Sequence, residues 1–216
     1  MRNTVQHMKI VAFSDTHMLH QKVDIPDGDL LIFAGDMSVC RTLQDVVGFN
    51  NFLKTLPHPH KIVVSGNHDH LLASSPDLGR ELLQNAIYLQ DSSVTLEGIT
   101  IYGSPWQPIF NTNACDAFAL PRGKVMRKKW DHIPEHTDIL ITHSPPCGIM
   151  DEDGGVSHGC SDLLKRVQQV QPRFHIFGHI HNHNGMQTIG KTCFINCNVK
   201  AKKGITRPAL AFDYYS

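Results

Sequence analysis

Five segments of this sequence end in side chains that commonly bind metal ions, and each is preceded by a short apolar run. The first run, "KIVAFSD", leads into Asp15 and His17, and the last, "RFHIFGH", leads into His179 and His181. The full set is Asp15 and His17, Asp36, Asn67 with His68 and Asp69, His143, and His179 with His181. Ligands of open α/β sheets bind outside the carboxyl ends of the strands, so we expect these side chains to meet at one place.

The donor atoms of this set are oxygen and nitrogen, without a thiolate, which does not suit a closed structural zinc site. One ion seldom needs so many ligands, whereas two ions about 3.5–4 Å apart share a bridging carboxylate and a bridging hydroxide. Asp36 is the natural bridging group, and the two-residue spacing of His179 and His181 points both rings to one side. The predicted cofactor is therefore a pair of divalent ions, Mn first, with Fe, Zn, Ni or Co as alternatives.

A site of this kind suits the hydrolysis of phosphate esters. The bridging hydroxide is a strong nucleophile at neutral pH, and the ions neutralise charge as phosphorus becomes pentacoordinate. His68 sits beside a ligand and is not needed as one, so it is placed to protonate or stabilise the leaving oxygen. We expect Asp69 to orient the His68 ring; the alternative is that it caps the segment that follows.

The elements that must position these residues alternate between strand and helix in the first half of the chain. Buried-type strands are predicted at 9–15, 29–36 and 61–67, with helices at 42–56 and 75–86, the second capped by Ser75. Two β segments around Glu97 and Gly98 indicate a hairpin. The later elements are helices at 124–133 and 160–170 and strands at 137–143, 173–179, 192–197 and 208–215.

Continuous apolar strands imply sheets that are covered on both faces. Strand–helix units followed by hairpins favour an α/β fold with two packed mixed β-sheets flanked by helices. The length of 216 residues suits a single domain over residues 1–216.

Composition limits the partners. Lys plus Arg and Asp plus Glu each number 20, so the chain lacks the basic field that binds nucleic-acid polymers. The apolar stretches are too short to span a bilayer, and the N-terminus has no signal-peptide segment. We expect a cytoplasmic protein with a small anionic substrate and no membrane partner, and the oligomeric state stays open. The runs "RKKW" and "KAKKG" are expected to be solvated surface.

In their order, these clusters resemble the calcineurin-like metallophosphoesterase superfamily, whose pattern is D-x-H, G-D, G-N-H-[D/E], a lone histidine and G-H-x-H. The resemblance runs from Asp15 to His181 and implies a sandwich of two β-sheets flanked by helices. It also implies residue roles: Asp15, His17 and His181 hold one ion, Asn67, His143 and His179 hold the other, Asp36 bridges, and His68 assists catalysis with support from Asp69.

Longer stretches, among them "KIVVSGNHD" and "FHIFGHIH", are similar to the brain-type metallophosphodiesterase (MPPED-like) branch, which implies activity on cyclic nucleotides and aryl diesters. The chain has Asp69 where that branch often has Glu. It keeps His179, where some animal members carry glycine, and the complete ligand set favours an active enzyme. The protein-phosphatase branch fits worse, because its G-D-x-x-D-R-G run reads "GDMSVCR" here. A bidentate arginine commonly binds a dianionic phosphomonoester, so the lack of an arginine at that position of the motif favours diesters as substrates.

Trp106 and Asn111, in "SPWQPIFNTN", are the predicted substrate contacts, since an aromatic ring there could stack on a nucleobase. The alternative for Trp106 is a core residue. Of the remaining histidines, His20 and His158 are the two whose position could place them near the pocket.

The leading hypothesis is a binuclear metal-dependent phosphodiesterase that hydrolyses small phosphodiesters, cyclic nucleotides first, by in-line attack of the bridging hydroxide. The alternatives are a phosphomonoesterase on small metabolites and a catalytically weak metal-binding scaffold.

Overall fold

A mixed β-sheet of five strands forms one half of the structure. The computed structural model describes residues 7–39, 42–110, 116–201, 204–205 and 207–215. In this sheet the strand order is β17–β1–β2–β3–β4; β1 to β4 are parallel and β17 is antiparallel to β1. The strands are β1 (His7–Phe13), β2 (Leu30–Ala34), β3 (His60–Val64), β4 (Ile87–Tyr88) and β17 (Leu210–Tyr215).

A second mixed sheet, of six strands, packs against the first. Its order is β13–β14–β12–β9–β6–β5, with four parallel central strands and an antiparallel strand at each edge. The strands are β5 (Ser92–Leu96), β6 (Ile99–Ser104), β9 (Ile139–Thr142), β12 (Phe174–Phe177), β13 (Gly185–Ile189) and β14 (Thr192–Asn196).

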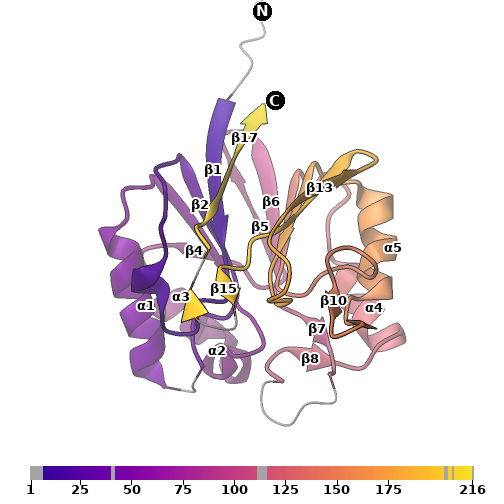
Figure 1. The fold of residues 1–216 in the computed structure, drawn as a ribbon, viewed down its shortest axis with the longest axis horizontal. Helices are drawn as coiled ribbons and strands as arrows, with labels where there is room; N and C mark the ends of the chain where they lie inside the picture. The colour runs from indigo at the N-terminus through magenta and orange to yellow at the C-terminus, as the bar shows by residue number, and fades with distance from the viewer. Residues whose placement is uncertain (1–6, 40–41, 111–115, 202–203, 206, 216) are drawn as a thin grey trace, which may run out of the picture.

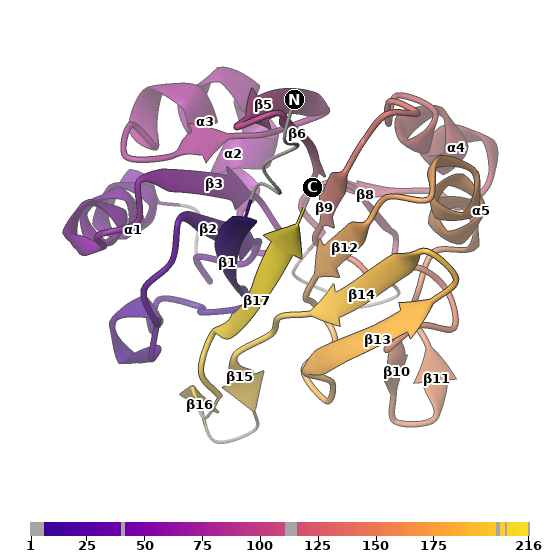
Figure 2. The same ribbon diagram turned by 90° about the horizontal axis from the view of Figure 1, so that it is seen from above.

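Helices cover the outer face of each sheet. Figure 1 shows α1 (Leu43–Thr55), α2 (His70–Ser74) and α3 (Pro76–Leu82) on the side of the first sheet and α4 (Lys124–Trp130) and α5 (Ser161–Val170) on the side of the second; the view from above in Figure 2 shows the same layers. The short elements are η1 (His20–Lys22), β7 (Gln107–Pro108) with β8 (Ala119–Leu120), β10 (Glu152–Asp153) with β11 (Val156–Ser157), and β15 (Lys200–Ala201) with β16 (Gly204–Ile205).

Alternation along the strands decides which layer each side chain joins. On β1, Ile10 and Ala12 belong to the core between the two sheets, whereas Val11 and Phe13 belong to the core beneath the first three helices. Successive side chains of a strand point to opposite faces, so a strand covered on both faces must be apolar throughout. The predicted fold, two packed mixed sheets flanked by helices, is confirmed.

Local sequence signals fix several of the element ends. The hydroxyl of Thr42 accepts from the N–H of Asp45 while the Asp45 carboxylate accepts from the N–H of Thr42, a capping box that starts α1. Glu97 and Gly98 have φ of 47° and 77°, as a two-residue hairpin turn between β5 and β6 requires. Ser75 precedes α3 as predicted, but no side-chain capping bond of Ser75 is found within the described chain, and α3 ends at Leu82.

The carboxyl ends of β1, β2 and β3 lie along one edge of the first sheet and those of β9 and β12 along one edge of the second, because these strands are parallel within each sheet. The two edges meet at one end of the sandwich, since the ring of His143, after β9, reaches the Ala34 carbonyl of β2 at 2.8 Å. The five clusters of polar residues follow these strands directly. None of the described helices is long and apolar enough to cross a bilayer.

Candidate metal centre

The backbone turns sharply where the strands end. Asp15, His17, Asp36 and His179 have φ of 60°, 42°, 63° and 67°, in the left-handed region that residues other than glycine seldom adopt. Hydrogen bonds between the loops hold these turns, such as those from the Asp15 N–H to the Gly35 carbonyl at 2.9 Å and from the His17 N–H to the Asp36 carbonyl at 3.0 Å. Strained residues of this kind gather at functional sites, where the surrounding structure enforces the conformation.

Asp15, His17 and His181 form a first group of donors. Nε2 of His181 lies 3.3 Å from Oδ1 of Asp15 and 3.4 Å from Nε2 of His17. One ligand atom from each residue lies within 4.8 Å of the other two. Three donors that face one point at this separation suit a single cation.

Asn67, His143 and His179 form a second group. Oδ1 of Asn67 lies 2.8 Å from Nε2 of His143 and 2.8 Å from Nδ1 of His179. The side chains come from the ends of three different strands, and two of them, Asn67 and His143, are buried. The amide oxygen and the two imidazole nitrogens therefore converge as the first group does.

The carboxylate of Asp36 lies between the two groups. Its Oδ2 is 3.4 Å from Nε2 of His143, in the second group, and 3.7 Å from Nε2 of His17, in the first. Nε2 of His68 lies 3.9 Å from the same oxygen. Asp36 is 1% exposed, and its other oxygen, Oδ1, accepts from the His68 N–H at 2.9 Å.

The residues present fit a pair of divalent cations. Asp15 and Asp36, two buried carboxylates, lie beside the imidazoles of His17, His143 and His181, and such buried charges need a partner of opposite sign. Nδ1 of His143 lies 2.8 Å from the Ala34 carbonyl, a bond that keeps a proton on Nδ1, so Nε2, which faces Asp36, is the nitrogen that could bind a cation. An oxygen and nitrogen donor set of this size agrees with Mn²⁺ and with similar ions.

Electrostatics keep most of these groups in the form that binds metal. Burial alone would raise the pKa of Asp15, but the hydrogen bond from His181 and the charge of His143 lower it to about 2. Burial lowers the pKa of His17 to about 4 and that of His179 to about 3. His143 is the exception: burial would lower its pKa, but Asp36 raises it to about 9. A cation at this site would take the place of the His143 proton.

Three glycines let the loops approach one another. A side chain at Gly178 would collide with Ser14 and with the carboxylate of Asp15, and one at Gly66 would collide with Asp36. Gly35 faces the ring of His143 in the same way. In each of the G-D, G-N-H and G-H-x-H motifs, glycine is therefore required because a Cβ would collide with a neighbouring candidate ligand.

Asp69 joins the loops that carry the ligands. Its Oδ2 accepts from the N–H groups of Gly66 at 2.7 Å and Asp36 at 3.0 Å, and its Oδ1 accepts from the N–H of Ser38 at 3.1 Å. Burial and the charge of Asp36 raise the pKa of Asp69 to about 7. These bonds give Asp69 a part in fixing the Asp36 loop, in addition to the predicted support of His68.

Two residues that the sequence motifs do not contain hold the G-H-x-H loop. The amide of Asn198 donates to the carbonyls of His181 at 3.1 Å and His183 at 3.3 Å, and Nη1 of Arg207 donates to the His181 carbonyl at 2.8 Å. Asn198 is fully buried. An asparagine or arginine in a loop carries no signal in the sequence for such a contact, because its partners are main-chain carbonyls.

Lys200 contributes a positive charge near the metal centre. Burial lowers the pKa of His17 and that of His68, and the positive charge of Lys200 adds to both shifts. Lys200 lies in the run "KAKKG", for which a solvated surface is predicted, yet it is half-buried. The run is therefore not uniform, and its first lysine brings a positive charge near the metal ligands.

The predicted substrate contacts fall in different places. The indole of Trp106 donates to Asp91 at 2.7 Å, and Asn111 lies outside the described residues. Phe110 packs beside the metal centre: its ring centroid lies 4.8 Å from that of His179 and 5.6 Å from that of His158. The histidine at 158 is thus near the site. His20 instead packs on the aromatic rings of α1, with centroids 4.8 Å and 5.3 Å away.

The chain is similar to known proteins in sequence and in fold. The family description "Calcineurin-like phosphoesterase superfamily domain" matches residues 8–198. A UPF0046 protein of Caenorhabditis elegans is 38% identical over 223 residues, which cover 95% of this chain and 75% of the worm protein. Human "Metallophosphoesterase domain-containing protein 1" is 40% identical over 219 residues, which cover 89% of this chain and 66% of the human protein. The crystal structure of TT1561 of Thermus thermophilus has the same fold, with a TM-score of 0.59 at 12% identity over 89% of this chain and 90% of that one.

Proposed function

The chain belongs to the calcineurin-like phosphoesterase superfamily, a family of phosphoester hydrolases, and we propose that it is a binuclear metal-dependent phosphodiesterase. The proposed substrates are small phosphodiesters, cyclic nucleotides first, and the proposed ions are Mn²⁺. The observation that carries the proposal is the position of Asp36, whose Oδ2 faces His17 at 3.7 Å on one side and His143 at 3.4 Å on the other.

Each group of donors has one task in this proposal. Asp15, His17 and His181 would hold one ion, Asn67, His143 and His179 would hold the other, and the Asp36 carboxylate lies between the two groups. When bound, such ions would lower the pKa of a coordinated water and neutralise charge on the phosphate oxygens. The buried carboxylates and the imidazoles beside them would keep the ligand atoms in place, and the strand ends fix their separation.

His68 is the proposed donor to the leaving oxygen. Its side chain is 23% exposed, more than Asp36 beside it, so one edge of the ring can reach a bound ester. The ring centroid lies 4.5 Å from that of His17, in edge contact, and His68, His17 and Asp36 lie close enough together that the three could also hold a cation. An imidazole N–H at this position stabilises the negative charge that develops on the leaving oxygen.

The cationic groups near the centre support a diester as substrate. The guanidinium of Arg207 is engaged with the carbonyls of His181 and Lys200, at 2.8 and 3.1 Å. Arg41 lies outside the described residues. Among the described residues, Lys200 adds a positive charge near His17 and His68, and its ammonium is a point charge rather than the bidentate fork that suits a dianionic monoester.

We also propose that residues 1–216 form one domain. The family description covers residues 8–198, and the later strand β17 pairs with β1 from His7↔Tyr215 to Ala12↔Leu210. The last described strand thus completes the sheet that the first one begins.

The test is reconstitution after chelation. Protein stripped of metal is supplied with Mn²⁺ and assayed with bis(4-nitrophenyl) phosphate, 4-nitrophenyl phosphate, and 2′,3′- and 3′,5′-cyclic AMP. Hydrolysis of the diesters that is lost in His68→Ala, with Mn²⁺ still bound, is the expected result. A preference for the monoester would replace the proposal by a phosphomonoesterase, and inactivity with every divalent ion would leave a metal-binding scaffold.

A further inference from the structure

Strand β13 forms an open edge of the second sheet. Its neighbour in the described structure is β14, to which a two-residue turn at Gly190 and Lys191 joins it. Figure 2 shows β13 on the outer side of the sheet, with β14 between it and β12. Residues 185–189 read GMQTI, without the charged residues or proline that commonly protect an exposed edge. A further strand could therefore pair with β13.

The side chains of β13 have little apolar contact. Met186 and Ile189 are 45% and 47% exposed, and neither belongs to a hydrophobic cluster of the described residues. The strand at the other edge of the same sheet, β5, differs, because Val94 and Leu96 pack against the core between the sheets. A strand that buries little apolar surface is only marginally stable, so β13 gains more than β5 from a partner.

The hairpin determines which main-chain groups of β13 point outward. Gly190 has φ of 61°, as a two-residue hairpin turn requires at its first position, and such a turn closes with a hydrogen-bonded pair, here Ile189 and Thr192. Hydrogen-bonded pairs alternate along an antiparallel ladder, so the N–H and carbonyl groups of Met186 and Thr188 face away from β14. No hydrogen bond from these groups to another segment is found within the described chain.

This pattern is complementary to itself. When two β13 strands pair antiparallel with Gln187 on a two-fold axis, Met186 of each copy lies opposite Thr188 of the other. These two residues carry the outward groups, so each of the two pairs can exchange both of its main-chain hydrogen bonds. Gln187 then lies opposite its own copy in a non-hydrogen-bonded pair, where Cα atoms are about 4.5 Å apart.

The charges beside β13 favour the same register. The register brings Lys191 of one copy toward His183 of the other, next to Asn182. The amide of Asn182 contacts the carboxylate of Asp153, and Lys191, Asp153 and Glu152 are all exposed. An ammonium group of one copy and carboxylates of the other therefore come together at each end of the paired strands.

We propose that two copies of this chain form a two-fold symmetric dimer through β13, which joins their second sheets into one continuous sheet. The contact of five residues from each copy is small, and small interfaces are typical of weak dimers, so the dimer forms at high protein concentration. β13 begins four residues after His181, which places the interface next to the loop of candidate ligands. The inference is independent of the proposed function.

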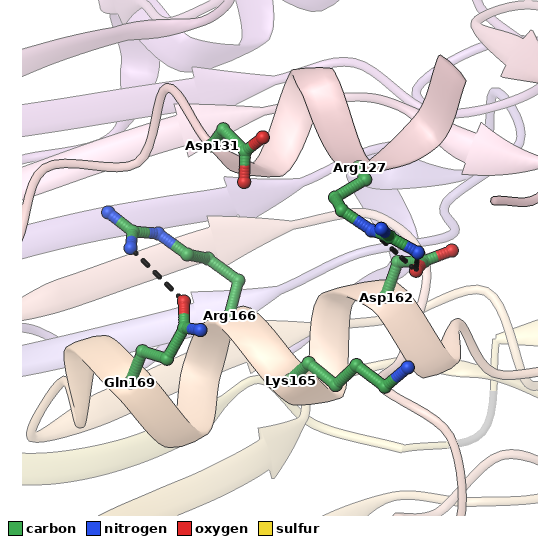
Figure 3. Close-up of a pocket in the computed structure, with 6 residues that line it drawn as sticks. All are labelled: Arg127, Asp131, Asp162, Lys165, Arg166 and Gln169. Atoms are coloured by element: carbon green, nitrogen blue, oxygen red, sulfur yellow. Dashed lines mark hydrogen bonds and ion pairs between the residues drawn. The ribbon is translucent and has the colours of Figure 1, made fainter. Parts of the chain in front are cut away.

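Oxidative cross-linking tests the register. Gln187→Cys places two thiols across the two-fold axis, at a Cα separation of about 4.5 Å that a disulfide can span. Gln169→Cys is the matched control, because Gln169 is also exposed and lies on α5, in a charged hollow of about 250 Å³ between α4 and α5 (Figure 3). With oxidised glutathione, Gln187→Cys is expected to give a disulfide-linked dimer on a non-reducing gel, whereas Gln169→Cys and the wild type stay monomeric. Equal cross-linking of both variants, or none in either, would overturn the proposal.

Sedimentation equilibrium tests the dimer without a cross-link. Between about 10 μM and 1 mM protein, the mean mass of the wild type is expected to rise from that of one chain toward that of two. Thr188→Pro removes an outward N–H that the hairpin does not use, so it is expected to weaken association by about tenfold or more.

Thr95→Pro is the control for this measurement. Thr95 also precedes the closing residue of a two-residue hairpin, at the other edge of the same sheet, and the variant is expected to associate as the wild type does. Circular dichroism shows whether each proline variant is folded, and if Thr188→Pro is not, the cross-link decides. A wild type that stays monomeric over the whole range, or equal association of the two folded proline variants, would overturn the proposal.

Discussion

The substitution Gly178→Ala adds one methyl group at the point where the ends of β12 and β1 meet. A Cβ at this position would collide with the hydroxyl of Ser14 and the carboxylate of Asp15. The same carboxylate accepts from the His179 N–H at 3.1 and 3.2 Å, so it cannot move without breaking those bonds. We therefore expect the variant to displace a predicted metal ligand.

The size of the effect follows from packing. One extra methyl in a filled interior costs about 1–3 kcal/mol of unfolding free energy. Gly48→Ala is the matched control, because Gly48 lies within α1 and a Cβ there meets nothing within 4 Å. That change replaces a poor helix former and should stabilise the protein by about 0.5–1 kcal/mol. The two variants should thus differ by about 1.5–4 kcal/mol.

The assay is urea unfolding in chelator, followed by calorimetric titration with Mn²⁺. Gly178→Ala should bind Mn²⁺ on the order of 10–100-fold more weakly, as when a group that positions a ligand is changed. Gly48→Ala should bind it as the wild type does. If Gly178→Ala loses stability but binds Mn²⁺ with unchanged affinity and stoichiometry, Asp15 is not a ligand.

Three other substitutions test separate parts of the account. His68→Ala should lower kcat on a diester by about 10²–10⁴-fold and leave Mn²⁺ stoichiometry unchanged, and a loss of bound metal would show that His68 is a ligand. Asn198→Ala removes the amide donor to the carbonyls of His181 and His183 and leaves them only the guanidinium of Arg207, so urea unfolding should show a loss of about 1–3 kcal/mol together with weaker Mn²⁺ binding; unchanged binding would show that the loop keeps its place without Asn198. Burial lowers the pKa of His175 from 6.5 to about 3. The free energy of unfolding therefore keeps its full value above pH 6.5 as far as His175 is concerned, and it falls as the pH falls, by about 2 kcal/mol at pH 5, because the unfolded chain takes up the proton first. His175→Gln should remove that part of the pH dependence of urea unfolding between pH 7.5 and 5, and equal slopes in both proteins would refute it.

The sequence predicts most of the fold because its signals are local. The apolar runs of the central strands, the helical spacing after Thr42 and the turn at Glu97 and Gly98 each depend on neighbours in the chain. β13 (Gly185–Ile189) is not predicted, because it is an edge strand with mostly exposed side chains and no apolar alternation. The five-residue α2 is too short to show a helical period.

The candidate ligands could be named from the sequence because their motifs follow strands of the two sheets that end at the same end of the sandwich. The supporting residues could not. Asn198 and Arg207 act through main-chain carbonyls of a distant loop, and Asp69 acts through main-chain N–H groups. Trp106 is held by Asp91, a partner 15 positions away. Contacts of this kind depend on the tertiary arrangement and leave no periodic trace in the chain.

The central claim is that two cations share the Asp36 carboxylate, and electron paramagnetic resonance of the Mn²⁺-loaded protein tests it most directly. The account predicts two Mn²⁺ per chain and the multiline spectrum of a spin-coupled pair, which Asp36→Ala abolishes. One Mn²⁺ per chain, or two with the six-line spectrum of isolated ions, would contradict it.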